Sequence, residues 1–161
     1  MKKKMFSFGD VLEIYDEHDD CLYVGKANEH SKLVNILLYD HQEKVIASLM
    51  EVVPAKQPTF EIALHDKLFT TVYKEDSWQW QSFLAKTEHE QRIHLVQPFH
   101  TSYMQIINDD VAVGTIRRDR YSWRECFTID LDSKDLTSVY LLMLLLMIIF
   151  YDKEPPKTNL L

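Results

Sequence analysis

Residues 139–151 read Val139-Tyr-Leu-Leu-Met-Leu-Leu-Leu-Met-Ile-Ile-Phe-Tyr151, an unbroken apolar run between Asp135 and Asp152. Leu and Met dominate the run, and such straight-chain residues favour a helix over a strand. A helix at a protein surface shows one apolar stripe, whereas this helix would be apolar on every side. The run therefore predicts a helix that is surrounded, either by the rest of the protein or by lipid.

The length of the run decides which of these two surroundings is favoured. A helix that crosses a bilayer needs roughly 20 apolar residues, and shorter runs are more often buried core helices. No cluster of Lys or Arg flanks the run as a topology signal, since Lys134 and Lys153 stand alone. We therefore predict a buried core helix, with a C-terminal membrane anchor as the alternative.

The residues before the run predict β-strands joined by short polar turns. In residues 59–64, for example, Phe60, Ile62 and Leu64 alternate with polar or small residues, as in a strand with one buried face. The other predicted strands are 11–15, 21–26, 33–39, 44–50, 68–73, 92–97, 102–107, 111–117 and 124–131. Residues 75–91 allow two interpretations: Asp76 and Gln79 could cap a helix, but the alternation around Trp80 favours a strand.

A short pattern recurs at the ends of several predicted strands. The copies are Leu12-Glu-Ile-Tyr-Asp16, Ile36-Leu-Leu-Tyr-Asp40, Ile62-Ala-Leu-His-Asp66 and the looser Gln105-Ile-Ile-Asn-Asp109. Repeated hairpins indicate an antiparallel meander, and about twelve strands are more than an open twisted sheet holds comfortably. We expect a mainly β fold, a closed antiparallel barrel of about twelve strands around the central hydrophobic C-terminal helix. Residues 1–154 would form this single domain, and residues 155–161 a flexible tail.

The net charge and the cysteines limit which cellular compartment and which classes of binding partner are expected. A net charge of −7 argues against nucleic-acid binding, which needs a basic face, and limits membrane association to a peripheral one at most. Cys21 and Cys126 have no metal-ligand spacing and read as free thiols in a reducing compartment. Lys2-Lys-Lys4 is not followed by an apolar segment, so no secretion signal is expected. These features predict a cytoplasmic protein, and they leave its oligomeric state open.

The one basic cluster is the candidate binding site. It holds four of the five arginines in the chain, namely Arg117, Arg118, Arg120 and Arg124. Guanidinium groups can bind a phosphate or carboxylate through paired hydrogen bonds. The alternative, which the net charge favours, is a solvated hairpin whose arginines pair with Asp119, Glu125 and Asp109 or Asp110.

Other polar and aromatic groups carry weaker signals. The acidic stretch 16–20 lacks the central Gly of a calcium loop and is better read as a hairpin turn. The seven histidines show no paired ligand spacing, and no nucleophile or nucleotide-binding motif is present. We therefore expect no catalytic residue, metal site or cofactor. Trp78, Trp80 and Trp123 could form a ligand-facing aromatic patch or could pack the ends of the barrel.

The arrangement of strands and final helix resembles the tubby C-terminal-like superfamily. The likeness is to its LURP-one-related and bacterial tubby-like members, with phospholipid scramblases as more distant relatives. The residues that carry it are Phe6-Ser-Phe-Gly-Asp10, Ile14-Tyr-Asp16, Leu38-Tyr-Asp40, Pro58-Thr-Phe-Glu-Ile62, the hairpin Tyr103 to Ile116, Arg120-Tyr-Ser-Trp123 and Phe127-Thr-Ile-Asp130. The Asp-Gly turns usual in that family are absent here, and residues 75–91 have no clear match.

The resemblance implies a barrel threaded by the hydrophobic helix, and it does not imply catalysis. It suggests a non-enzymatic binding protein that recognises a lipid head group or a protein partner. A small membrane protein, anchored by its C-terminal run and involved in lipid movement, is the alternative. No phosphoinositide-binding motif of the family maps onto the arginine cluster, so that site is not carried over.

Overall fold

The computed structural model describes residues 2–8, 11–28, 32–52, 57–75, 80–87, 92–98, 103–121, 124–131, 139, 141–143 and 146. These residues form twelve strands, each running antiparallel to its neighbours. The strands are β1 (Lys2–Phe8), β2 (Val11–Tyr15), β3 (Cys21–Ala27), β4 (Asn35–Asp40), β5 (Val45–Glu51), β6 (Thr59–Leu64), β7 (Lys67–Lys74), β8 (Trp80–Thr87), β9 (Arg92–Pro98), β10 (Tyr103–Asn108), β11 (Val111–Tyr121) and β12 (Arg124–Leu131).

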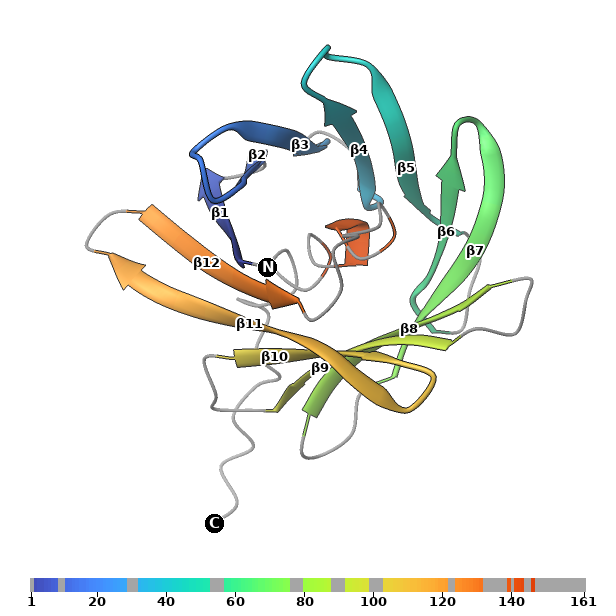
Figure 1. The fold of residues 1–161 in the computed structure, drawn as a ribbon. Coiled ribbons are helices and arrows are strands. Elements are labelled where there is room, and N and C mark those ends of the chain that lie inside the picture. Colours follow the sequence, from blue (N-terminus) through green and yellow to red (C-terminus); the bar gives the residue numbers. More distant parts are fainter. Residues whose placement is uncertain are drawn as a thin grey trace.

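Each strand pairs with the next strand in the sequence, as expected of a meander, and the two end strands also pair with each other. In that last pair, Lys4 lies opposite Thr128 and Phe6 opposite Cys126. The order of paired strands is therefore that of a closed barrel. The strands form a ring around a common interior (Figure 1). The prediction of a mainly β, antiparallel fold is confirmed.

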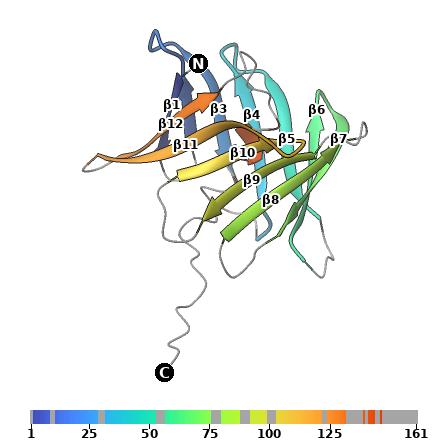
Figure 2. The same ribbon diagram turned by 60° about the horizontal axis from the view of Figure 1, so that its bottom comes forward.

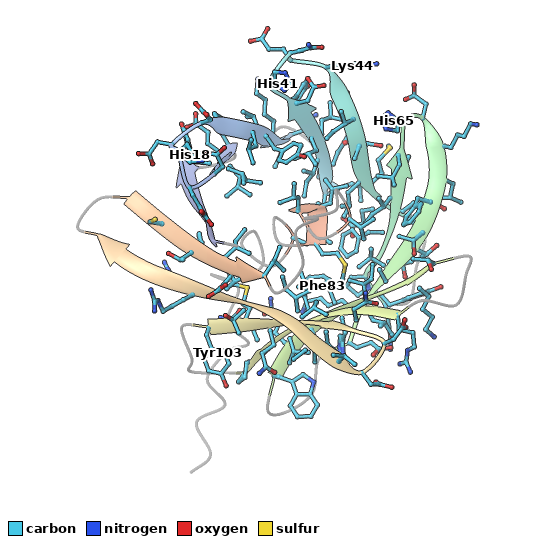
Figure 3. All side chains as sticks on the ribbon, viewed as in Figure 1. His18, His41, Lys44, His65, Phe83 and Tyr103 are labelled. Atoms are coloured by element: carbon cyan, nitrogen blue, oxygen red, sulfur yellow. The ribbon has the colours of Figure 1, made fainter. Side chains whose placement is uncertain are left out.

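The inner face of the ring is apolar because every second residue of a strand points the same way. On β2 and β4, for example, the inward residues Leu12, Ile14, Ile36 and Leu38 are at most 1% exposed. Phe83 points from β8 toward the interior (Figure 3) and meets Phe60 of β6 edge to face, with ring centroids 6.1 Å apart. One hydrophobic cluster contains residues from β2 and from β4 to β12, and Tyr23 and Ala27 of β3 pack against it.

The C-terminal apolar run contributes to the same cluster. Five of its residues are described, all are helical, and each is at most 2% exposed: Val139, Leu141, Leu142, Met143 and Leu146. At about 100° per residue, Leu141 and Met143 lie about 160° apart around the helix axis. Burial therefore reaches nearly opposite sides of this segment, which lies inside the ring of strands (Figure 1). The remainder of the predicted helix lies outside the described residues.

The recurring sequence pattern corresponds to a recurring irregularity in four hairpins. The pairing register shifts after Ile14, Leu38, Ile62 and Ile106. In each hairpin one apolar residue of the returning strand is skipped, and these residues are Leu22, Ile46, Phe69 and Val113. Such a bulge increases the local twist and bends the strand, which helps a sheet to curve into a ring. The hairpin repeat is thus present in the structure as well as in the sequence.

Several expectations need adjustment. β1 was not among the predicted strands, because its three lysines give no apolar alternation. Residues 80–87 form β8, so the strand interpretation of residues 75–91 is right for this part and the helix interpretation is wrong there. Residues 76–79 and 88–91 lie outside the described residues, as do residues 147–161 with the predicted domain boundary at 154. Cys21 and Cys126 are not joined in a disulfide.

Candidate functional site

The arginine cluster lies at one end of the β11–β12 hairpin, and the sheet divides it. Arg117 is exposed, whereas Arg118 is half-buried. The two are consecutive in β11, so their side chains leave opposite faces of the sheet. Arg118 lies opposite Phe127, a core residue only 1% exposed, and therefore belongs to the inner wall. Arg117 and Arg118 therefore do not form a single surface patch.

The other two arginines are known from their backbone positions. Arg120 lies opposite Glu125 and Arg124 lies opposite Tyr121, at the end of the same hairpin. Their side chains are outside the described part of the structure. That the four arginines bind an anion stays a prediction, and among those with described side chains Arg117 is the one on the outer surface.

Arg117 ends a row of outward residues that crosses four neighbouring strands, which we call the aromatic row: Trp80, Pro98, Tyr103 and Arg117. Trp80 lies opposite Pro98, and Tyr103 lies opposite Arg117. The β9–β10 pairing itself reaches Gln105 and Val96, two residues short of Tyr103 and Pro98. Strands β8 to β11 lie side by side in this order (Figure 2).

The exposure of the aromatic row is large for such side chains. Trp80 is 38% exposed and Tyr103 is 42% exposed, although aromatic residues are usually well buried. Each member is next in sequence to a buried inner-wall residue, and these are Gln81, Gln97, Met104 and Ile116. The alternation of the strands thus turns the row outward. Trp78 and Trp123, the other candidates for an aromatic patch, lie outside the described residues.

The opposite end of the barrel carries acidic hairpin turns. His18, His41 and His65 lie at the tips of three hairpins there, while Tyr103 lies on another side of the molecule (Figure 3). Positive φ angles, which favour glycine, are taken in these turns by Asp19, Glu43, His65, Asp66, Asp109 and Asp110. With only three glycines in the chain, polar side chains supply these turn conformations.

The acidic side chains in two of these turns have a structural role. Asp16 Oδ1 accepts hydrogen bonds from the backbone N–H groups of His18 and Asp20, at 2.8 and 3.0 Å. Asp40 Oδ1 does the same with Gln42 and Lys44, at 2.9 and 3.0 Å. The hydrogen bond from Lys44 is the main cause that holds the pKa of Asp40 below its usual value. The stretch 16–20 is therefore a hairpin turn, as expected.

Buried polar residues gather on three adjacent strands. Among the described residues, those that are buried and polar are Thr70, Gln81, Ser82, Thr87 and Gln97, all on β7, β8 or β9. Gln81 lies opposite Gln97, and Thr70 opposite Thr87, on the inner wall. Gln81 Nε2 and Thr87 Oγ1 have no hydrogen-bond partner. The sequence pattern did not reveal this group. Its polar residues are buried at positions where apolar alternation would place apolar ones.

His94 is a partly buried histidine of β9. It projects from the outer face of β9 opposite Leu84, which is only 1% exposed. Its Nε2 is buried and has no partner. Burial is the main cause that lowers the pKa of His94, and the charge of Arg92 acts in the same direction, while Glu75 and Asp110 oppose the shift.

The lowered pKa of His94 predicts a pH-dependent stability. The ordinary pKa of histidine is 6.5, and around and below this pH the unfolded state protonates the residue more readily than the folded state does. The free energy of unfolding therefore falls as the pH drops through that value. As the pH is lowered from about 8 to about 5.5, we expect the urea midpoint of the wild-type protein to fall, and that of His94→Leu to fall less. His41→Gln, at an exposed hairpin tip, is the control and should keep the wild-type decline. An unchanged decline in His94→Leu would contradict the assignment to His94.

The described residues contain no group of three or more His, Cys, Asp or Glu side chains that could hold a metal ion. In the same part of the chain, no helix is both long and apolar enough to cross a membrane.

The fold and the exposed row define the class of the molecule, a mainly β antiparallel protein with an outward aromatic and arginine surface. The sequence matches no protein-family model, and no curated protein matches it significantly.

Proposed function

We propose that this chain is a non-enzymatic cytoplasmic binding protein that recognises the phosphate-bearing head group of a lipid. In this proposal the fold is tubby-like, with the barrel closed around the whole C-terminal helix. The observation that carries the function is the exposed Arg117 beside Tyr103 on the outer surface. A guanidinium binds a phosphate well, and aromatic side chains with polar edges suit the boundary between water and lipid.

The proposed ligand is bound peripherally, from the outside of the barrel. Supporting this, five residues of the C-terminal run are buried in the cluster that also contains the inward strand residues. An anchored membrane protein, the alternative function, would need this run to leave the core and enter lipid. Its withdrawal would expose apolar surface on every strand that now contacts it.

Vesicle flotation tests the proposal. We expect the protein to float with vesicles made of phosphatidylcholine, phosphatidylethanolamine and phosphatidylglycerol, and Arg117→Glu to lower the bound fraction several-fold because the charge reversal repels phosphate. Lys67→Glu, an exposed charge reversal at the opposite end of the barrel, is the matched control and should bind like the wild type.

Two results would count against this function. If the wild-type protein does not float, the lipid head group is the wrong ligand and a protein partner becomes the better proposal. If the protein stays in the membrane pellet after carbonate treatment, it is held integrally, and the buried position of the C-terminal run does not describe the cellular form.

A further inference from the structure

The outer face of strands β4 to β7 carries an apolar patch. The inward residues of these strands are buried, so the residues that alternate with them face outward. Three of the outward residues are large, apolar and well exposed: Val45 is 40% exposed, Met50 54% and Leu68 58%. Three more are partly exposed. We call the six together the β4–β7 patch: Leu37, Tyr39, Val45, Met50, Ala63 and Leu68.

The pairing of the strands makes the patch continuous. Tyr39 of β4 lies opposite Val45 of β5. One row below, Ser48 lies between Leu37 and Ala63, and Ala63 in turn lies opposite Leu68 of β7. Met50 follows Ser48 on the same face of β5. Only a short serine interrupts the apolar rows, which therefore cross all four strands.

The charges around the β4–β7 patch cancel. Lys26 marks the side toward β3, where its Nζ lies 5.0 Å from the centre of the Tyr39 ring. The charged residues on the patch rows and at the hairpin tips beside them are four of each sign: Lys26, Lys44, Lys67, Lys86, Asp40, Glu43, Glu61 and Asp66. The chain as a whole has a net charge of −7, so this balance is a local property. A strongly charged partner gains nothing from such a surface, whereas an apolar surface with charges of both signs fits it.

A second copy of the chain is such a surface. In a two-fold dimer the same patch lies on both sides of the interface, so each bordering charge can meet the opposite sign from the same set. Antiparallel sheets also pack face to face, about 10 Å apart, with their side chains interleaved. We propose that the β4–β7 patch is covered by the β4–β7 patch of a second copy, which makes the protein a two-fold dimer.

The size of the patch predicts a weak dimer. Four strands about 4.8 Å apart and about five residues of each, at about 3.4 Å per residue, cover a few hundred Å² per copy. A standard stable interface buries roughly 800 Å² per partner. We therefore expect a dissociation constant on the order of 100 µM, so that monomer prevails in dilute solution.

The dimer leaves the surface of the proposed function accessible. Strands β8, β9 and β10 lie between the patch and β11 in one direction around the ring, and β12, β1, β2 and β3 in the other (Figure 1). Arg117 on β11 therefore lies well away from the patch. The dimer goes beyond the proposed lipid recognition and does not depend on it.

Sedimentation equilibrium over a range of about 5 to 500 µM protein tests the dimer. We expect the average mass of the wild type to rise from that of the monomer toward that of the dimer. Met50→Asp and Leu68→Asp should each weaken association at least tenfold, because the dimer would bury an added carboxylate. Val111→Asp is the matched control: Val111 is 62% exposed on β11, outside the patch, and this variant should associate like the wild type. Circular dichroism should show that all three variants are folded, since the substituted side chains are exposed.

The balance of charges has a test of its own. Glu61→Lys and Lys44→Glu each give the border a net charge that the second copy repeats, so each should weaken association several-fold. The double variant restores the balance and should associate nearly as well as the wild type. Undiminished association in both single variants would overturn the proposed self-complementarity.

Two further results would overturn the dimer. The first is a wild-type protein that stays monomeric at the highest concentration, or Asp variants at Met50 and Leu68 that associate as well as the wild type. The second is a monomeric wild type whose vesicle flotation is lowered by Met50→Asp, which would mean that lipid covers the patch. A loss of flotation in Arg117→Glu alone concerns the lipid function and leaves the dimer unaffected.

Discussion

Leu142→Asp should prevent the protein from folding. Leu142 is 0% exposed and belongs to the hydrophobic cluster shared by the strands and the C-terminal segment. The substitution removes a buried apolar side chain, which costs about 2–5 kcal/mol, and adds a carboxylate that must be buried unpaired or protonated at a further cost. Together these costs approach the entire stability of about 5–15 kcal/mol that a domain of ordinary size has.

Circular dichroism and size-exclusion chromatography of the purified variant are the measurements. Leu142→Met keeps volume and polarity nearly unchanged and should fold. Leu68→Asp places the same charge at a position that is 58% exposed and should have little effect. If Leu142→Asp yields only insoluble protein, Leu142→Ala provides the quantitative value, and a loss of about 2–5 kcal/mol is expected from urea unfolding. Wild-type stability in both variants would contradict the burial of this segment in the barrel core.

Gly114→Ala should lower the free energy of unfolding by about 2 kcal/mol, because the added methyl group has no space. A Cβ at this position would lie 2.6 Å from Leu131 Cδ2 and 2.7 Å from the backbone oxygen of Asp130. The leucine side chain can move, but the backbone of β12 is held by its pairing with both β11 and β1. Replacing glycine normally favours folding by less than about 1 kcal/mol, through the entropy of the unfolded chain, so the clash decides the sign.

The urea midpoint of Gly114→Ala, measured beside that of Thr115→Ala, provides the comparison. Thr115 is the next residue of β11 and is exposed, so its truncation tests the same strand without the steric conflict. Thr115→Ala should change stability by no more than about 0.5 kcal/mol. If Gly114→Ala is more stable than the wild type, β12 can move away from the added methyl group. That result would contradict the prediction that the close approach of β11 and β12 requires glycine here.

Much of the fold follows from local patterns in the sequence. Alternation of apolar and polar side chains predicts the strands from Val11 to Leu131 with boundaries within a few residues of those observed. The repeat that ends in Asp16, Asp40 and Asp66 marks hairpins that share one irregular geometry. β1 escaped prediction because its three lysines give no apolar alternation and because one of its two partners, β12, is distant in the sequence. No local pattern in Lys2–Phe8 indicates this pairing.

The candidate site depends much more on tertiary structure. By itself the sequence predicted that the fold is antiparallel and mainly β, and it favoured a buried helix over a membrane anchor for the run near its end, since side-chain periodicity and hydrophobicity are local properties. It also located Arg117 and Trp80 as candidates. Only the register between strands placed Trp80, Pro98, Tyr103 and Arg117 in one row and put Arg118 on the opposite face. Register joins residues far apart in the chain, and a shift of one residue would reverse which side chains face outward.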